Sequence, residues 1–166
     1  MAANSSSAPG RAQRSQSRGV LRGRSVWSGI LVGVGIAAFV DETVFHQLLR
    51  WHHFYDKSTT DIGLISDGLF HAFGWFAVVI GMVMVADLCR RSGLSGRGLT
   101  GGILLGAGAF QLYDGTVQHK LLGLHQIRYD VDLLPYDLTW NVLAVIMLVA
   151  GAWFVLLARR SSRGSG

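Results

Sequence analysis

One apolar stretch occurs twice in this chain of 166 residues, and that repetition limits the folds open to it. The copies cover residues 29–52 and 102–125, and at a constant offset of 73 residues they match at 12 of 24 positions. Two helices that shared only an apolar composition would not also share an Asp, a Thr and two His in register. We therefore interpret the stretch as an internal duplication, and the polar residues kept in both copies are the first candidates for function.

Four stretches of the chain contain no Lys, Arg, Asp or Glu, namely residues 26–40, 68–86, 98–113 and 138–158. A bilayer core about 30 Å thick needs roughly 20 mostly apolar residues as helix. The second and fourth stretches are long enough, and the first and third become so when Asp41 and Asp114 lie inside the helix. We predict an all-α fold, an integral membrane four-helix bundle built from two tandem two-helix repeats.

Eleven of the 15 basic residues lie in the first 24 residues, in the loop 90–97 or after residue 158, and the other four lie in the two loops at the opposite end or beside them. By the positive-inside rule both termini are expected in the cytoplasm. We expect a disordered basic tail over 1–24, a membrane domain over 25–160 with repeats at 26–89 and 99–158, and a second tail over 161–166. The net charge of +5 then reflects orientation in the membrane, so no nucleic-acid partner is expected, and no cleavable signal peptide either.

Small residues recur four apart in both copies, as Gly29 and Gly33 and again as Gly102 and Gly106. Such pairs let helix backbones approach closely in lipid, so we assign these glycines to packing. The single Cys89 excludes an internal disulfide and a metal cage made of cysteines.

Each repeat contributes two spans, so both copies face the same way and are related by an axis along the membrane normal. Corresponding polar residues are then expected to meet at the non-cytoplasmic end. The second helices of the two repeats also correspond, at an offset of 70 residues. Asp67 matches Asp137, and His71 is replaced by Asn141.

Imidazoles beside carboxylates favour zinc, iron or copper. In an ideal α-helix Asp41 and His46 lie about 140° apart, whereas Glu42 and His46 share a face, as do Asp67 and His71. We therefore predict a transition-metal site whose direct ligands are His46, His71, His119 and Glu42. Residues that would support these ligands, or replace them, are Asp41, Asp67, Asp114, His52, His125, Asp137 and Asn141.

Three alternatives stay open. Haem could take His46 and His119 as axial ligands in a four-helix membrane bundle. The Asp and His residues could instead carry protons or a solute without any metal. The carboxylates of Asp41 and Asp114 could also merely pair with Arg50, Lys57 or Lys120, or accept hydrogen bonds from Tyr113 and the Thr hydroxyls. The sequence does not decide whether the protein is an enzyme, a carrier or a sensor, nor whether it forms a homo-oligomer.

The runs DETVFHQLLRWHHFYD, LFHAFGW and LYDGTVQHKLLGLHQIRYDVDLLPYDLTWN resemble a bacterial family of predicted four-span integral membrane proteins catalogued as a domain of unknown function. The resemblance covers residues 27–157. It implies a multi-pass protein of the bacterial inner (plasma) membrane and supplies no activity.

Overall fold

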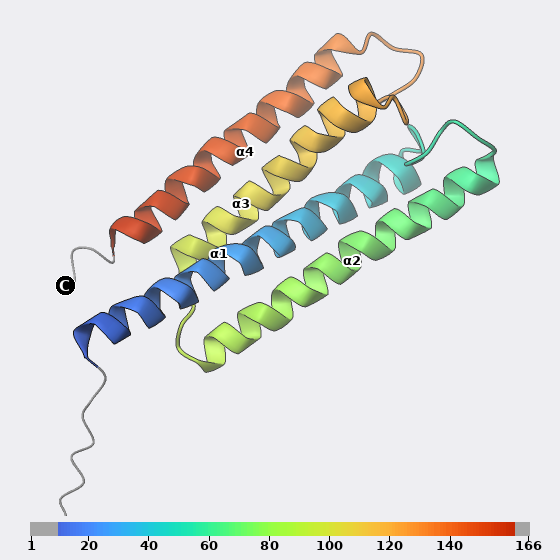
Figure 1. The fold of residues 1–166 in the computed structure, drawn as a ribbon. Helices are drawn as coiled ribbons and strands as arrows, with labels where there is room; N and C mark the ends of the chain where they lie inside the picture. The colour runs from blue at the N-terminus through green and yellow to red at the C-terminus, as the bar shows by residue number, and fades with distance from the viewer. Residues whose placement is uncertain (1–9, 162–166) are drawn as a thin grey trace, which may run out of the picture.

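The computed structural model describes residues 10–161, and within them the chain forms four long α-helices and no strand (Figure 1). Two of the helices continue directly into π-helical segments. In chain order the elements are α1 (Arg11–Asp41), η1 (Glu42–Leu48), α2 (Thr60–Arg90), α3 (Gly96–Tyr113), η2 (Asp114–Leu121) and α4 (Leu134–Arg160). The all-α prediction is confirmed.

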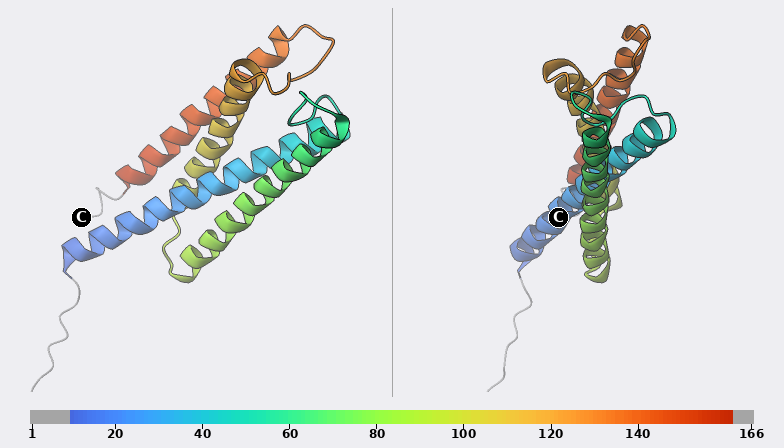
Figure 2. Two further views of the ribbon diagram at one scale, coloured as in Figure 1. Left: turned by 45° about the vertical axis from the view of Figure 1, so that its right-hand side comes forward. Right: turned by 90° about the vertical axis from the view of Figure 1, so that its right-hand side faces the viewer.

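The helices lie in the spatial order α4, α3, α1, α2, which Figure 1 shows from one side to the other. The central pair is α1 and α3, with α2 packed on α1 and α4 packed on α3. Helices α2 and α4 make no extensive contact with each other, so the four helices form an open row. The two loops that follow η1 and η2 meet at one end of this row (Figure 2).

Helices α1 and α3 touch through their glycines. A Cβ atom added to Gly29 would lie 2.9 Å from the Cα of Gly102, and one added to Gly102 would lie 2.9 Å from the Cα of Gly29. Gly33 and Gly106 likewise face the backbones of Ile103 and Ile30. The packing role predicted for these glycines is confirmed, because no side chain fits between the two helices.

The outer helices bury one narrow stripe and expose the rest of their apolar surface. On α2 the buried residues follow steps of mostly three and four, which is the spacing of one helical face: Gly63, Asp67, Phe70, Gly74, Ala77, Gly81 and Leu88. Leu69 and Val83 are 70% and 65% exposed. By length and composition, three helical segments of the described chain could cross a membrane, Gly19–Leu48, Thr60–Arg90 and Leu134–Arg160, and α3 with η2 is not among them.

The expected disordered tail over 1–24 is wrong for residues 11–24, which form the first turns of α1. Contacts with the far end of α2 hold this part in place. Arg24 forms an ion pair with Asp87 at 3.0 Å, and the Leu21 side chain packs at Gly93. Residues 1–9 and 162–166, which include the rest of both predicted tails, lie outside the described residues.

Candidate metal centre

The apolar helices α1 and α3 each change to π-helical hydrogen bonding where their polar residues begin. At the end of η1 the N–H of Leu49 donates to the carbonyl of Val44, five residues earlier, at 2.9 Å. At the end of η2 the N–H of Leu122 donates to the carbonyl of Val117 at 2.8 Å. A π-helix bonds residue i to residue i+5, so a side chain and its fifth successor lie closer to one face than they do in an α-helix. Such segments are rare and frequently occur at functional sites.

This backbone overturns the helical-phase argument against Asp41, which assumed an ideal α-helix. Asp114 Oδ2 lies 3.1 Å from His119 Nε2, and Asp41 Oδ2 lies 3.8 Å from His46 Nε2. Each aspartate therefore shares a face with the histidine five residues later. Side-chain patterns alone do not reveal the wider turn of a π-helix, so these segments could not be predicted from the sequence.

Directly after each π-helix the chain turns back through a residue with positive φ, Arg50 at 51° and Gly123 at 54°. A left-handed residue commonly ends a helix in this way. The turn brings His52 and His125 back beneath the ends of α1 and α3, where both side chains are buried.

His52 and His125 are each held by a backbone carbonyl of the other half of the molecule. Nδ1–H of His52 donates to the carbonyl of Ile127 at 3.0 Å, and Nδ1–H of His125 donates to that of Phe54 at 2.9 Å. A carbonyl can only accept, so both Nδ1 atoms carry the ring proton and both Nε2 atoms offer a lone pair. The two contacts involve residues 73 apart in the sequence, His52 with His125 and Phe54 with Ile127.

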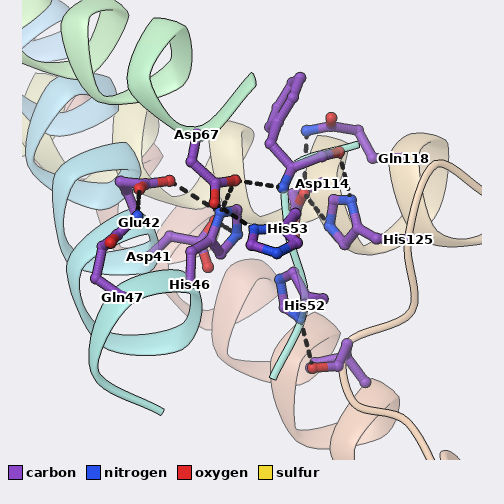
Figure 3. Close-up of polar contacts among 12 residues, drawn as sticks. Asp41, Glu42, His46, Gln47, His52, His53, Asp67, Asp114, Gln118 and His125 are labelled. Atoms are coloured by element: carbon purple, nitrogen blue, oxygen red, sulfur yellow. Dashed lines mark hydrogen bonds and ion pairs between the residues drawn. The ribbon is translucent and has the colours of Figure 1, made fainter. Parts of the chain in front are cut away.

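The four repeated histidines form one buried cluster, of which Figure 3 shows His46, His52 and His125. The rings of His52 and His125 stack at 4.4 Å, with His46 4.5 Å from His52 and His119 4.7 Å from His125. Nε2 of His119 lies 3.0 Å from Nε2 of His125. Among the described residues, Nε2 of His46, Nε2 of His52 and Nδ1 of His119 have no hydrogen-bond partner.

Four carboxylates surround this cluster and are all at least 96% buried: Asp41, Glu42, Asp67 and Asp114. None of them forms an ion pair with Lys or Arg within residues 10–161. Lys57 donates instead to the carbonyl of Leu122 at 2.9 Å, and Lys120 pairs with Asp137. The alternative in which these carboxylates only balance Lys57 or Lys120 is therefore wrong, and their charge must be met by protons or by a bound cation.

Asp67 joins the cluster from α2. Its Oδ1 accepts hydrogen bonds from the Phe54 N–H at 2.7 Å and from His46 Nδ1 at 3.1 Å, and its Oδ2 lies 2.6 Å from His53 Nδ1. Sequence reasoning missed His53, because Gln126 stands at the matching position of the second copy. The sequence feature that could have identified His53 is its position directly after His52.

The second half lacks this arrangement. Gly115 stands where the first half has Glu42, and a Cβ on Gly115 would lie 2.6 Å from the Trp140 ring and 2.9 Å from Asn141 Oδ1. The Asn141 amide donates to the carbonyl of Asp137 at 2.8 Å. Asp137 and Asn141, both predicted as supporting residues, are thus engaged with each other and with Lys120.

His71, predicted as a direct ligand, is not brought to the cluster. It is exposed on α2 and lies 5.2 Å from the ring of Phe39. The buried stripe of α2 steps from Asp67 to Phe70 and then to Gly74, so His71 falls beside it. The convergence of His46, His71 and His119 expected from the sequence does not occur.

The two loop histidines are neutral near pH 7. Burial lowers the pKa of His52 to about 2, with the neighbouring imidazoles of His125 and His46 acting in the same direction. Burial also lowers the pKa of His125 to about 4, against the opposing charge of Asp114. Neutral imidazole is the form that binds metals.

A polar cavity of about 690 Å³ opens onto the cluster from one side. Its walls include His46, His52 and His53, with Arg50 and Tyr129 nearer the loops. The cavity gives the first half of the cluster a route to the outside.

Long apolar helices with a buried ionisable cluster at one end define an all-helical membrane protein with a polar centre. The chain belongs to the family DUF2243, described as a predicted membrane protein, whose model matches residues 28–159. That family is a domain of unknown function. No curated protein and no solved structure matches the chain.

Proposed function

We propose that this membrane protein binds a transition-metal ion at the four-histidine cluster formed by His46, His52, His119 and His125. The observation that carries the proposal is the pair of buried, unpartnered Nε2 atoms of His46 and His52 beside His125. A buried ring nitrogen without a hydrogen-bond partner lowers the stability of the fold unless a ligand binds it. One ring nitrogen from each of these three residues fits within a group whose atoms all lie within 4.8 Å of one another.

The surroundings of the imidazoles resemble those of metal-bound histidines. Such a histidine almost always donates its other N–H to a carbonyl or a carboxylate, which fixes the ring. His52 and His125 do so with Ile127 and Phe54. Asp114 forms a second group with His119 and His125, so it supplies a carboxylate ligand, with Asp41 nearby.

The donor set favours copper, zinc or iron, since imidazole suits all three and no thiolate takes part. Haem is less well supported. The stacked rings of His52 and His125 lie 4.5 Å from His46 and 4.7 Å from His119, respectively, and occupy the space that a porphyrin between those two residues would need.

The proposal places the centre at the non-cytoplasmic face of the inner membrane. The start of α1, the end of α2 and the start of α3 lie at the end of the helix row opposite the cluster (Figure 1), and these parts of the chain contain Arg22, Arg24, Arg90, Arg91 and Arg97. With the positive-inside rule this puts both termini in the cytoplasm. In this proposal α3 with η2 is the fourth span, and the two halves are tandem repeats.

The test is metal analysis of the full chain purified in detergent and dialysed against Cu²⁺, Zn²⁺ or Fe²⁺. The proposal expects stoichiometric metal without a Soret band, lost in the double variant His52→Ala, His125→Ala. A Soret band would instead select haem. Absence of both metal and chromophore would leave the proton or solute pathway.

A further inference from the structure

We infer that the site holds a second cation, bound between the carboxylates of Glu42 and Asp67 and Nδ1 of His46. This inference rests on the proposed function and deepens it, since it makes the centre dinuclear. His46 connects the two positions, because its Nδ1 faces Glu42 and Asp67, while its Nε2 lies 3.8 Å from Asp41 Oδ2 and its ring lies 4.5 Å from that of His52.

Two carboxylates, those of Glu42 and Asp67, face the single nitrogen Nδ1 of His46. Nδ1 of His46 lies 2.8 Å from Glu42 Oε2 and 3.1 Å from Asp67 Oδ1, yet a neutral ring nitrogen has one proton at most. The hydrogen-bond geometry directs that proton to Asp67. Glu42 Oε2 is therefore left without a hydrogen-bond partner in the described chain, on a side chain that is only 1% exposed. A cation between the three atoms removes this conflict, because it takes the place of the Nδ1 proton, which is released to solvent; His46 with an ion on each nitrogen is then an imidazolate.

The remaining oxygens of Glu42 and Asp67 are already held in place. Gln47 donates to Glu42 Oε1 at 2.7 Å, which the π-helical spacing of i and i+5 allows. His53 contacts Asp67 Oδ2 at 2.6 Å. Outer hydrogen bonds of this kind orient carboxylate ligands of metals. The ligand atoms of Glu42, His46 and Asp67 all lie within 4.8 Å of one another.

The proposed position is accessible in the first half of the molecule, and its counterpart in the second half is closed. The cavity of about 690 Å³ is lined by His46, Gln47 and His53, the residues that contact Glu42 and Asp67, so it lies beside this corner of the cluster. In the second half the matching place is filled by Trp140 and Asn141 against Gly115. One half of the molecule therefore offers a carboxylate site, and the other closes it.

The two positions differ in chemistry. Two carboxylates with one imidazole suit zinc, iron or manganese, whereas the imidazole-rich position suits copper or zinc. Zinc is the ion that both would accept, so it is the probe for counting them.

The experiment is equilibrium dialysis of the purified, metal-free full chain in detergent against Zn²⁺. We expect two ions per wild-type chain and one in Glu42→Gln, which keeps the size of the side chain and removes its charge. Asp137→Asn alters the second half's counterpart of Asp67, which pairs with Lys120 away from the cluster, and is expected to keep two. Size-exclusion chromatography and circular dichroism report whether each variant is folded.

One Zn²⁺ per wild-type chain, unchanged in Glu42→Gln, would overturn the second site and leave the proposed function standing. Two ions in both proteins would also overturn it, by placing the second ion elsewhere. No bound ion in the wild type would overturn the proposed function as well.

Discussion

At the scale of residues, the hydrogen bond made by one nitrogen of an imidazole ring decides which nitrogen faces the centre of the cluster. His52 and His125 exchange hydrogen bonds with carbonyls of the opposite half, and this leaves their Nε2 atoms for the centre. His71 shows the converse, because an exposed imidazole on α2 has nothing to bind at the cluster. The position of a histidine in the fold, rather than its residue type, therefore decides whether it can be a metal ligand.

Removal of one cluster imidazole is expected to weaken metal binding strongly. His52→Ala or His125→Ala deletes a proposed ligand and should lower affinity by at least about 100-fold, since loss of a supporting partner alone costs roughly 10–100-fold. Competition against a chelator of known affinity measures the change. His71→Ala is the matched control and should bind like the wild type. Equal loss in all three variants would contradict the assignment.

The lowered pKa values of His52 and His125 predict a pH dependence of stability in the metal-free protein. The folded chain keeps both rings neutral at pH values where the unfolded chain, with a pKa near 6.5, takes up protons. Acid therefore favours unfolding, and stability is complete above pH 6.5 and falls as pH drops from there toward 4.

Thermal unfolding in detergent at pH 7.5, 6 and 5 checks this dependence. Other groups titrate as well, so the informative quantity is the difference between wild type and His52→Gln. The midpoint of the variant is expected to fall less between pH 7.5 and 5. Identical slopes in the two proteins would contradict the account.

At the scale of elements, the π-helices explain why the polar residues of α1 and α3 converge. They place Asp41 beside His46 and Asp114 beside His119, which an unbroken α-helix would turn apart. The glycine contacts between α1 and α3 then bring the two π-helices together. Both features are needed before four imidazoles can meet.

A larger side chain at the crossing of α1 and α3 is expected to separate them. Gly102→Val would drive a side chain into the backbone of α1 at Gly29 and Ile30, so folded yield should fall, and metal binding with it. The matched control is Gly68→Ala on α2, where a Cβ meets nothing within 4 Å. This control should be neutral or stabilising by about 0.5–1 kcal/mol.

Fluorescence-detected size exclusion after a heating series measures both variants. If Gly102→Val proved as heat-resistant as Gly68→Ala, the close approach of α1 and α3 would be wrong.

At the scale of the whole molecule, the apolar segments predicted the helices, and the repeated histidines and aspartates predicted which end carries the polar centre. The sequence could not predict the open row, because the order of packing depends on contacts between helices. It could not separate His71 from His53 either. His71 fits a helical spacing yet falls beside the buried stripe, and His53 is unmatched in the second copy yet binds Asp67.

The orientation of the molecule can be tested with its single cysteine. Cys89 is exposed at the end of α2 opposite the cluster and is expected on the cytoplasmic side. A membrane-impermeant maleimide should label it only after cells are opened. In a Cys89→Ser background, Ser58→Cys in the loop beside the cluster should react in intact cells. The reverse pattern would invert the topology.

The central claim is that imidazole nitrogens of the four-histidine cluster hold a metal ion. X-ray absorption at the zinc edge of the zinc-loaded chain tests it most directly. The account predicts nitrogen or oxygen neighbours at about 2.0–2.1 Å, with outer-shell scattering from several imidazole rings that weakens in His52→Ala, His125→Ala. A first shell made only of oxygen, with no imidazole scattering and no change in that variant, would contradict it.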